Sequence, residues 1–243
     1  MSEREETYNA EAPKGNSRID GRLLDELRPM SFELGIQKHV AGSALIKWGD
    51  THVICSATLE ERVPSFIEEG GWATAEYALL PGSTHSRVRR DRKGPSGRTA
   101  EIQRLIGRSL RGAIDLKALE GYTLTLDCDV LQADGGTRCA SITGAYVAAA
   151  IALKGIGYEP APFAAVSFGL VGGELMTDLC YEEDSRAEVD MNIVFAQQGL
   201  IEVQGTAERR PFSSSQLMEM VQRAEAASET IFALQREAIK SWR

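Results

Sequence analysis

The spacing of apolar positions changes several times along the chain, and each spacing predicts a type of element. Apolar and polar residues alternate with the period of half-buried strands in four early segments, Met30–Leu34, Ser43–Trp48, Thr51–Leu59 and Trp72–Leu79. The dipeptide Gly49-Asp50 separates the second segment from the third, so these two strands are expected to form a hairpin.

The spacing becomes helical after a basic segment. Thr99 is expected to cap a helix that runs to about Leu119. Apolar residues fall on one face of this helix, and three arginines line the other, Arg104, Arg108 and Arg111. Such a stripe is more typical of a solvated or subunit-facing surface than of a ligand site.

The second half of the chain alternates strands with helices. We expect a strand at Tyr122–Leu131, a glycine loop at Ala133–Arg138 and a helix of small residues at Ala140–Leu153. Four more strands and a final helix follow, at Phe163–Val171, Glu174–Asp178, Glu188–Phe195, Leu200–Gln204 and Ser213–Ile239. This order predicts an α+β fold (α/β mixed sheets) in which helices cover the sheets. No linker composition interrupts residues 17–243, so they are expected to form a single domain after a polar, disordered lead at 1–16.

The composition narrows the class of protein. Hydrophobic residues make up 43% of the chain and charged residues 26%, as in ordinary globular proteins. No apolar run reaches the roughly 18–20 residues of a membrane span, and the N-terminus lacks a signal-peptide pattern, so a cytoplasmic protein with no membrane partner is expected. The four cysteines show no CxxC spacing, which argues against zinc and disulfides. Three of them lie among apolar residues and are expected to be inert core thiols, Cys55, Cys128 and Cys180.

The net charge of −8 hides a strong asymmetry. Pro81–Arg111 holds nine Lys or Arg against two acidic residues, whereas Asp178–Asp190 holds six carboxylates against Arg186 alone. Steering of a polyanion depends on the local field, so the net charge does not exclude nucleic acid. The two segments together could hold an anion and a cation side by side.

Two features suit a phosphate. In the loop before the second helix, Gly135 and Gly136 allow close backbone approach, while Thr137 and Arg138 add a hydroxyl and a planar guanidinium. Arg98 stands at the start of the first helix, where the helix dipole disfavours a cation unless an anion binds there. The alternatives are a tight turn with an exposed arginine and a solvated loop arginine.

The acidic stretch suits a divalent cation. Asp178, Asp184 and Asp190 supply the hard oxygen ligands that Mg²⁺ takes, and Asp190 lies on the strand face opposite its apolar neighbours. An acidic surface loop is the alternative.

The basic loop has two interpretations. Flexible arginines such as Arg87, Arg89, Arg90 and Arg92 can follow a phosphate backbone without reading sequence, but a subunit interface is an equally serious interpretation. No G-x-S-x-G elbow or phosphate-binding loop of the G-x-x-x-x-G-K-[ST] type is present, which argues against serine hydrolases and P-loop enzymes.

Longer motifs carry a resemblance to a known family. SGRTAEIQRLIGRSL from Ser96, LDCDVLQADGGTR from Leu126, ASITGA from Ala140 and EVQGTAE from Glu202 resemble the RNase PH family in that order. The resemblance extends from about Arg18 to Ala238. Gly82 departs from it, because the family usually has Arg there, which removes one candidate RNA contact.

The resemblance implies a fold, a reaction and an assembly. The fold would be the RNase PH fold of paired β-α-β-α units, similar to ribosomal protein S5 domain 2, in a ring-shaped homohexamer built as a trimer of dimers. The activity would be phosphate-dependent 3′→5′ removal of nucleotides from precursor tRNA and other RNA with a free 3′ end. Arg98, Gly136, Thr137 and Arg138 would bind inorganic phosphate. Asp184 and Asp190 would be the catalytic pair associated with Mg²⁺, with Asp178 in support.

Because phosphate is already an anion, the enzyme would have to hold two anions together rather than create a nucleophile. The reaction would be reversible with nucleoside diphosphates. Two other functions remain open at this point. One is a non-catalytic ring subunit that binds RNA, and the other is a hydrolytic ribonuclease that uses metal-activated water.

Overall fold

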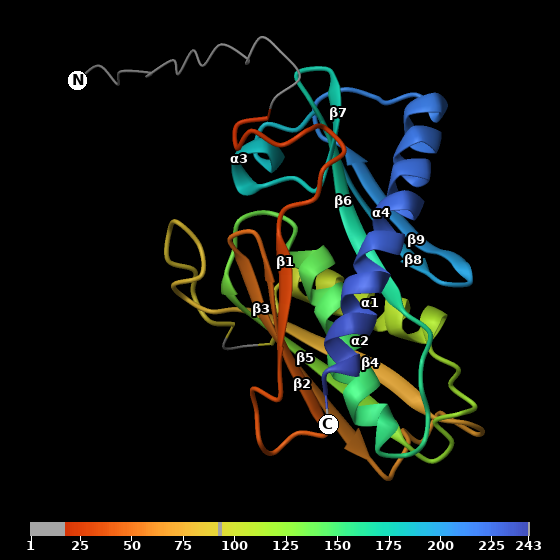
Figure 1. The fold of residues 1–243 in the computed structure, drawn as a ribbon. Coiled ribbons are helices and arrows are strands. Elements are labelled where there is room, and N and C mark those ends of the chain that lie inside the picture. The colour runs from red at the N-terminus through yellow and green to blue at the C-terminus, as the bar shows by residue number, and fades with distance from the viewer. Residues whose placement is uncertain (1–17, 92–93, 243) are drawn as a thin grey trace.

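The computed structural model describes residues 18–91 and 94–242, and in those residues it shows two sheets with helices packed on them (Figure 1). The first sheet has the order β1 (Met30–Leu34), β2 (Gly42–Trp48), β3 (Thr51–Glu60), β5 (Thr123–Gln132), β4 (Trp72–Leu79). Its strands pair antiparallel except for β4 and β5, which are parallel. The second sheet is antiparallel throughout, with the order β7 (Glu174–Thr177), β6 (Phe163–Val171), β8 (Val189–Ala196), β9 (Gly199–Ala207).

Helix α2 (Thr137–Lys154) lies between the two sheets, where it packs against β2 and β3 on one side and β6 on the other. Every residue from Cys139 to Leu153 is buried, which explains the small residues along this helix. A Cβ added at Gly144 would lie 2.7 Å from Cys55 Sγ, so only glycine permits this close approach of helix and strand. The first turn of α2 is therefore held at a fixed place between the sheets.

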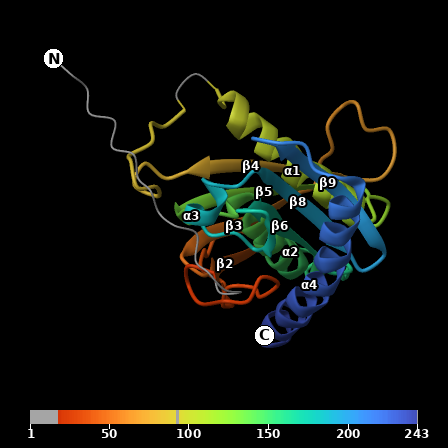
Figure 2. The same ribbon diagram turned by 90° about the horizontal axis from the view of Figure 1, so that it is seen from above.

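Three other helices complete the described fold. Helix α1 (Gly97–Ala113) packs on β4 and reaches β9, as Figure 2 shows, and α4 (Ser214–Lys240) covers β6 and β8. Helix α3 (Tyr181–Asp184) is one short turn between β7 and β8. None of the helices in the described residues combines the length and apolar character that a bilayer span requires.

The predicted mixed α+β fold is confirmed. The strands β1, β4 and β6 have the predicted bounds, and the other strand ends differ by three residues or fewer. All four cysteines lie in the described residues and are buried and unpaired, as expected for Cys55, Cys128 and Cys180, and Cys139 is buried as well. The disordered lead at 1–16 lies outside the described residues, and the single domain over 17–243 stays a prediction.

Helix boundaries were predicted less well. Ser96, rather than Thr99, caps α1, because its side chain accepts a hydrogen bond from the Thr99 N–H at 3.2 Å. The helix ends at Ala113 instead of Leu119, because the following turn bonds elsewhere: the Gly71 N–H donates to the Leu116 carbonyl at 2.8 Å. Helix α2 begins at Thr137 instead of Ala140, so the end of the predicted glycine loop is its first turn.

Candidate active site

The glycine loop joins β5 to α2 in a conformation that requires glycine. Gly135 and Gly136 have φ angles of 72° and 64°, in the left-handed region. A Cβ added at Gly135 would lie 2.6 Å from the carbonyl oxygen of Leu179. The loop therefore lies directly against the acidic segment that leads into α3.

The start of α2 is suited to an oxyanion. Gly136 is the N-cap residue and offers no side-chain acceptor to the first N–H groups, and the first turn contains no acidic residue. Thr137 and Arg138 lie in this first turn. The Thr137 hydroxyl lies 3.0 Å from the Tyr77 hydroxyl, which fixes its position.

Arg138 lies between two carboxylates. Its Nη2 donates to Glu101 Oε2 at 3.3 Å, and its Nη1 lies 3.7 Å from Asp190 Oδ2. Burial opposes ionisation of Glu101, but a hydrogen bond from Gln204 and the charge of Arg138 outweigh it and lower the pKa of Glu101. Within the part of the chain that the structure describes, Arg138 Nε is buried without a hydrogen-bond partner. The guanidinium thus retains a donor for an anion.

Asp184 and Asp190 both lie in a poorly solvated place, and Asp190 is exposed to the charge of Asp184. Asp184 ends α3, and Asp190 is the second residue of β8. Burial raises the pKa of Asp184, although Arg138 and Arg98 oppose the shift. Burial and then the charge of Asp184 raise the pKa of Asp190 to about 6. A bound cation stabilises the ionised form of two partly buried carboxylates that lie near each other.

These groups line one cleft of about 310 Å³. Six residues predicted from the sequence contribute to its wall: Arg98, Gly136, Thr137, Arg138, Asp184 and Asp190. They come from α1, from the first turn of α2 and the Gly136 that precedes it, from α3 and from β8. The two charged segments of the sequence therefore meet at a single site.

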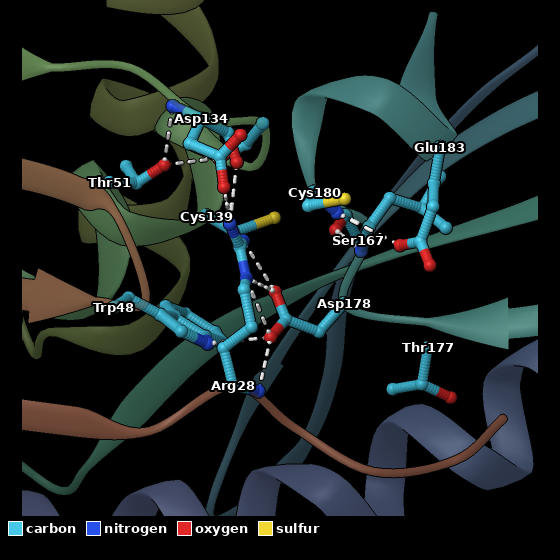
Figure 3. A network of polar contacts seen from close by, with 12 residues as sticks. Arg28, Trp48, Thr51, Asp134, Cys139, Ser167, Thr177, Asp178, Cys180 and Glu183 are labelled. Atoms are coloured by element: carbon cyan, nitrogen blue, oxygen red, sulfur yellow. Dashed lines mark hydrogen bonds and ion pairs between the residues drawn. The ribbon is translucent and has the colours of Figure 1, made fainter. Parts of the chain in front are cut away.

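Asp178, which the sequence predicted as a supporting metal residue, does not line this cleft, and its contacts are those of a structural carboxylate. Its side chain is buried, and its Oδ2 accepts hydrogen bonds from the Arg28 backbone N–H at 2.7 Å and from Trp48 Nε1 at 2.9 Å (Figure 3). Its Oδ1 accepts from Arg28 Nη2 at 2.7 Å. Both oxygens are therefore committed to protein donors. In the described residues, no group of three or more His, Cys, Asp or Glu side chains is arranged to hold a metal ion.

Sequence reasoning missed the arginines that hold this region together. Arg28 Nη1 donates to the Asp134 carbonyl of the glycine loop at 2.5 Å while its Nη2 binds Asp178 (Figure 3). Arg18, 3% exposed, donates through Nε to Glu183 Oε1 at 2.8 Å and through Nη2 to the Asp178 carbonyl at 2.8 Å. The N-terminal segment thus clamps the glycine loop to the acidic segment. The sequence offers one weak indication of these contacts, which is that arginines lie close together near the N-terminus of a chain with a net negative charge.

The structure describes part of the basic loop. Arg87, Arg89 and Arg90 are exposed, and the last two line a second hollow of about 550 Å³ that shares Arg98 with the cleft. Arg92 and Lys93 lie outside the described residues. This placement is compatible both with an RNA path toward the cleft and with a subunit interface.

Comparison with known proteins covers most of the chain. The sequence model of the 3′ exoribonuclease family, domain 1, matches residues 26–154, and that of domain 2 matches residues 161–227. Ribonuclease PH of Moorella thermoacetica is 53% identical over 91% of this chain and 94% of its own length. Ribonuclease PH of a Synechococcus strain is 50% identical over 91% of this chain and 97% of its own length.

Solved structures share the fold at lower identity. Rice Rrp46 superposes with a TM-score of 0.79 at 20% identity, over 92% of this chain and all of that one. The Archaeoglobus fulgidus exosome, solved with RNA bound to its active site, gives a TM-score of 0.77 at 22% identity, over 89% of this chain and 91% of that one. Fold and relatives together define a 3′ exoribonuclease of the phosphorolytic class, for which inorganic phosphate is the co-substrate. The chain belongs to the RNase PH family.

Proposed function

We propose that this cleft removes nucleotides one at a time from the 3′ ends of precursor tRNA and other RNA tails by phosphorolysis. One observation carries the assignment to this cleft. Donors for an anion and carboxylates for a cation line the same cavity, with Arg138 3.7 Å from Asp190. A site that joins two anions needs both kinds of group.

Inorganic phosphate is bound by the positive side of the cleft. The N–H groups at the start of α2 and the Thr137 hydroxyl donate hydrogen bonds to it, and Arg98 and Arg138 supply opposite charge. Each charge-assisted hydrogen bond contributes about 1.5–3 kcal/mol. The set holds one phosphate beside the terminal phosphodiester.

Asp184 and Asp190 are the residues that would hold Mg²⁺. The donor set fits, because Mg²⁺ commonly takes one or two carboxylates and completes its shell with water and substrate phosphate oxygens. Burial and the charge of Asp184 raise the pKa of Asp190, and such a cation would offset both effects. When bound, Mg²⁺ neutralises the negative charge that accumulates on the phosphoryl oxygens.

The reaction exchanges one phosphate linkage for another. An oxygen of the bound phosphate attacks the terminal phosphorus, and the bond from that phosphorus to the O3′ of the preceding nucleotide breaks. The proton of the hydrogenphosphate ends on this O3′, so the products are a nucleoside diphosphate and an RNA shorter by one nucleotide. Arg98 and Arg138 keep the nucleophile and the phosphodiester in contact despite their charges.

Replacing Arg138 by Ala should raise the phosphate concentration needed for half-maximal rate by about 10–100-fold, the equivalent of one lost charge-assisted hydrogen bond. The measurement is nucleoside diphosphate release from a 3′-tailed RNA across a phosphate titration. Arg62→Ala is the matched control, because Arg62 is a mostly exposed surface arginine paired with Glu60. An unchanged phosphate requirement in Arg138→Ala would refute the phosphate site. Cleavage by the wild-type protein without phosphate would instead indicate hydrolysis.

The remote RNA surface is assigned to the basic loop in a homohexamer. A folded precursor tRNA is far larger than one cleft, so its body must rest on surface supplied by neighbouring subunits.

Replacing both Arg89 and Arg90 by Gln tests this assignment. The double variant should bind structured RNA more weakly, and the slope of log binding constant against log salt concentration should become shallower by about 1–2. A short oligonucleotide should be trimmed at nearly the normal rate. Sedimentation must show that the variant still forms the ring. Equal losses on both substrates in an intact ring would place the loop inside the active site instead.

A further inference from the structure

Two aromatic side chains line the cleft without any part in the phosphate or metal site. The rings of His85 and Tyr181 lie with centroids 5.1 Å apart and planes inclined at 45°. Both side chains are exposed, and Tyr181 exposes 48% of its surface although it is large and mostly apolar. A single exposed aromatic residue is unremarkable, but a pair in the wall of a substrate cleft offers π faces to a ligand.

The two rings are held in place from opposite sides of the glycine loop. On one side, the Ala133 N–H donates to the Ser83 carbonyl at 2.8 Å, which ties the turn before His85 to the loop. On the other side, the Tyr181 N–H donates to Asp134 Oδ1 at 3.2 Å. The two backbone segments that carry the rings are therefore both tied to the glycine loop.

The chain also fixes the distance of the pair from the reacting group. Tyr181 begins the single turn of α3 that ends at Asp184, so the ring and the catalytic carboxylate belong to one rigid element. The clamp formed by Arg18 and Glu183 holds this turn against the N-terminal segment. A nucleotide whose phosphodiester lies at Asp184 has its base within reach of the same turn.

We propose that His85 and Tyr181 form a stacking platform for the nucleobase of the 3′-terminal nucleotide, the one that leaves as a nucleoside diphosphate. This inference rests on the proposed function. Every base has a π face, so stacking holds the terminal nucleotide without reading its identity, as an enzyme that removes successive nucleotides requires. Larger purine faces should be held slightly better than pyrimidines.

The test combines a variant of the protein with a variant of the RNA. Tyr181→Ala should lower kcat/KM on a short single-stranded oligonucleotide by about tenfold, within the range measured for one base on one aromatic ring. An oligonucleotide with an abasic 3′-terminal residue should lose a similar factor with the wild-type protein. Because both changes remove the same contact, Tyr181→Ala should lose little more on the abasic substrate.

Two outcomes would overturn the platform. The first is that Tyr181→Ala lowers kcat/KM on the abasic oligonucleotide by the same factor as on the unmodified one, which would mean that the ring and the terminal base act independently. The second is that the effect of Tyr181→Ala depends on an abasic residue only when that residue is at an inner position of the oligonucleotide, which would show that an inner base, not the terminal one, stacks on the ring.

Matched variants separate stacking from folding. Tyr181→Phe and His85→Phe keep a ring and should keep most of the activity, whereas His85→Ala should lose it in part. Phe66→Ala is the control for an exposed aromatic residue outside the cleft. The midpoint of thermal unfolding should change little in Tyr181→Ala, because about half of the residue is exposed, at 48%. Failure of the proposed function is recognised separately, since the wild-type protein would then release no nucleoside diphosphate from the unmodified oligonucleotide.

Discussion

Replacing Asp190 by Asn is expected to lower kcat/KM by about a thousandfold or more and, at the same time, to stabilise the metal-free protein at neutral pH. The loss of activity follows from the proposed role of Asp190 as a charged ligand for Mg²⁺, because the charge stabilisation that such an ion supplies is worth several kcal/mol. The gain in stability follows from the position of this carboxylate. It is poorly solvated and lies near the charge of Asp184.

The sign of the stability effect comes from proton binding. The pKa of Asp190 is about 6 in the folded protein and 3.8 in the unfolded chain, so between these pH values the folded state binds more protons than the unfolded state. The free energy of unfolding therefore falls as pH rises through this range, and the penalty is complete above pH 6. A shift of this size corresponds to about 3 kcal/mol, which partial exposure of the side chain reduces to about 2 kcal/mol.

Urea unfolding with a chelator and without phosphate would measure this effect. Asp190→Asn should be more stable than the wild-type protein at pH 7.5, and the difference should disappear as the pH approaches 4. Adding Mg²⁺ at pH 7.5 should stabilise the wild-type protein and not the variant. Asp25→Asn, at an exposed position, is the control. A variant that is less stable than the wild-type protein at pH 7.5 would contradict the electrostatic account.

Replacing Asp178 by Asn should have the opposite effect and destabilise the protein by about 3–5 kcal/mol, the range for breaking a buried ion pair on one side. The substitution removes the nearer counter-charge of the buried Arg28 guanidinium and leaves the more distant Asp134, at 3.5 Å. It also replaces one of the two carboxylate oxygens that accept hydrogen bonds from Arg28 and Trp48 with an amide NH₂ group, which cannot accept. Asn is the suitable replacement because Asp178 has a φ of 56°, and Asn tolerates this left-handed conformation. The backbone is thereby left without added strain.

Chemical denaturation of Asp178→Asn and of Glu182→Gln would test this. Glu182 belongs to the same acidic stretch but forms an exposed ion pair with Arg186, so its substitution should change stability by about 0.5 kcal/mol or less. At low temperature, folded Asp178→Asn should keep a normal Mg²⁺ requirement. Unchanged stability together with a raised Mg²⁺ requirement would restore the sequence-based assignment of Asp178 to the metal.

These two aspartates show what sequence alone can and cannot provide. Strand alternation predicted that Asp190 faces away from the apolar residues of β8, and the cleft lies on that side. The structural role of Asp178 depends instead on its hydrogen-bond partners, Arg28 and Trp48, which lie 150 and 130 residues away in the chain. No local pattern reports such distant contacts.

The same limit applies to the elements. The strands were predictable because alternation is a local property of a two-sided sheet. Helix α3 was missed because four residues are too few to show helical spacing. The buried arginines were missed because arginine is usually exposed, and only the assembled fold shows that Arg18 is enclosed.

The clamp also fixes the order in which the active site is completed during synthesis. Arg18 is made early, but Glu183 follows 165 residues later, and Asp178 follows Arg28 by 150. Closing such long loops is slow, and it requires the second sheet to have left the ribosome. A nascent chain that ends after α2 would therefore contain the glycine loop without the acidic segment that lies against it. We therefore expect nuclease activity only after the last-made half of the protein has joined the first-made residues.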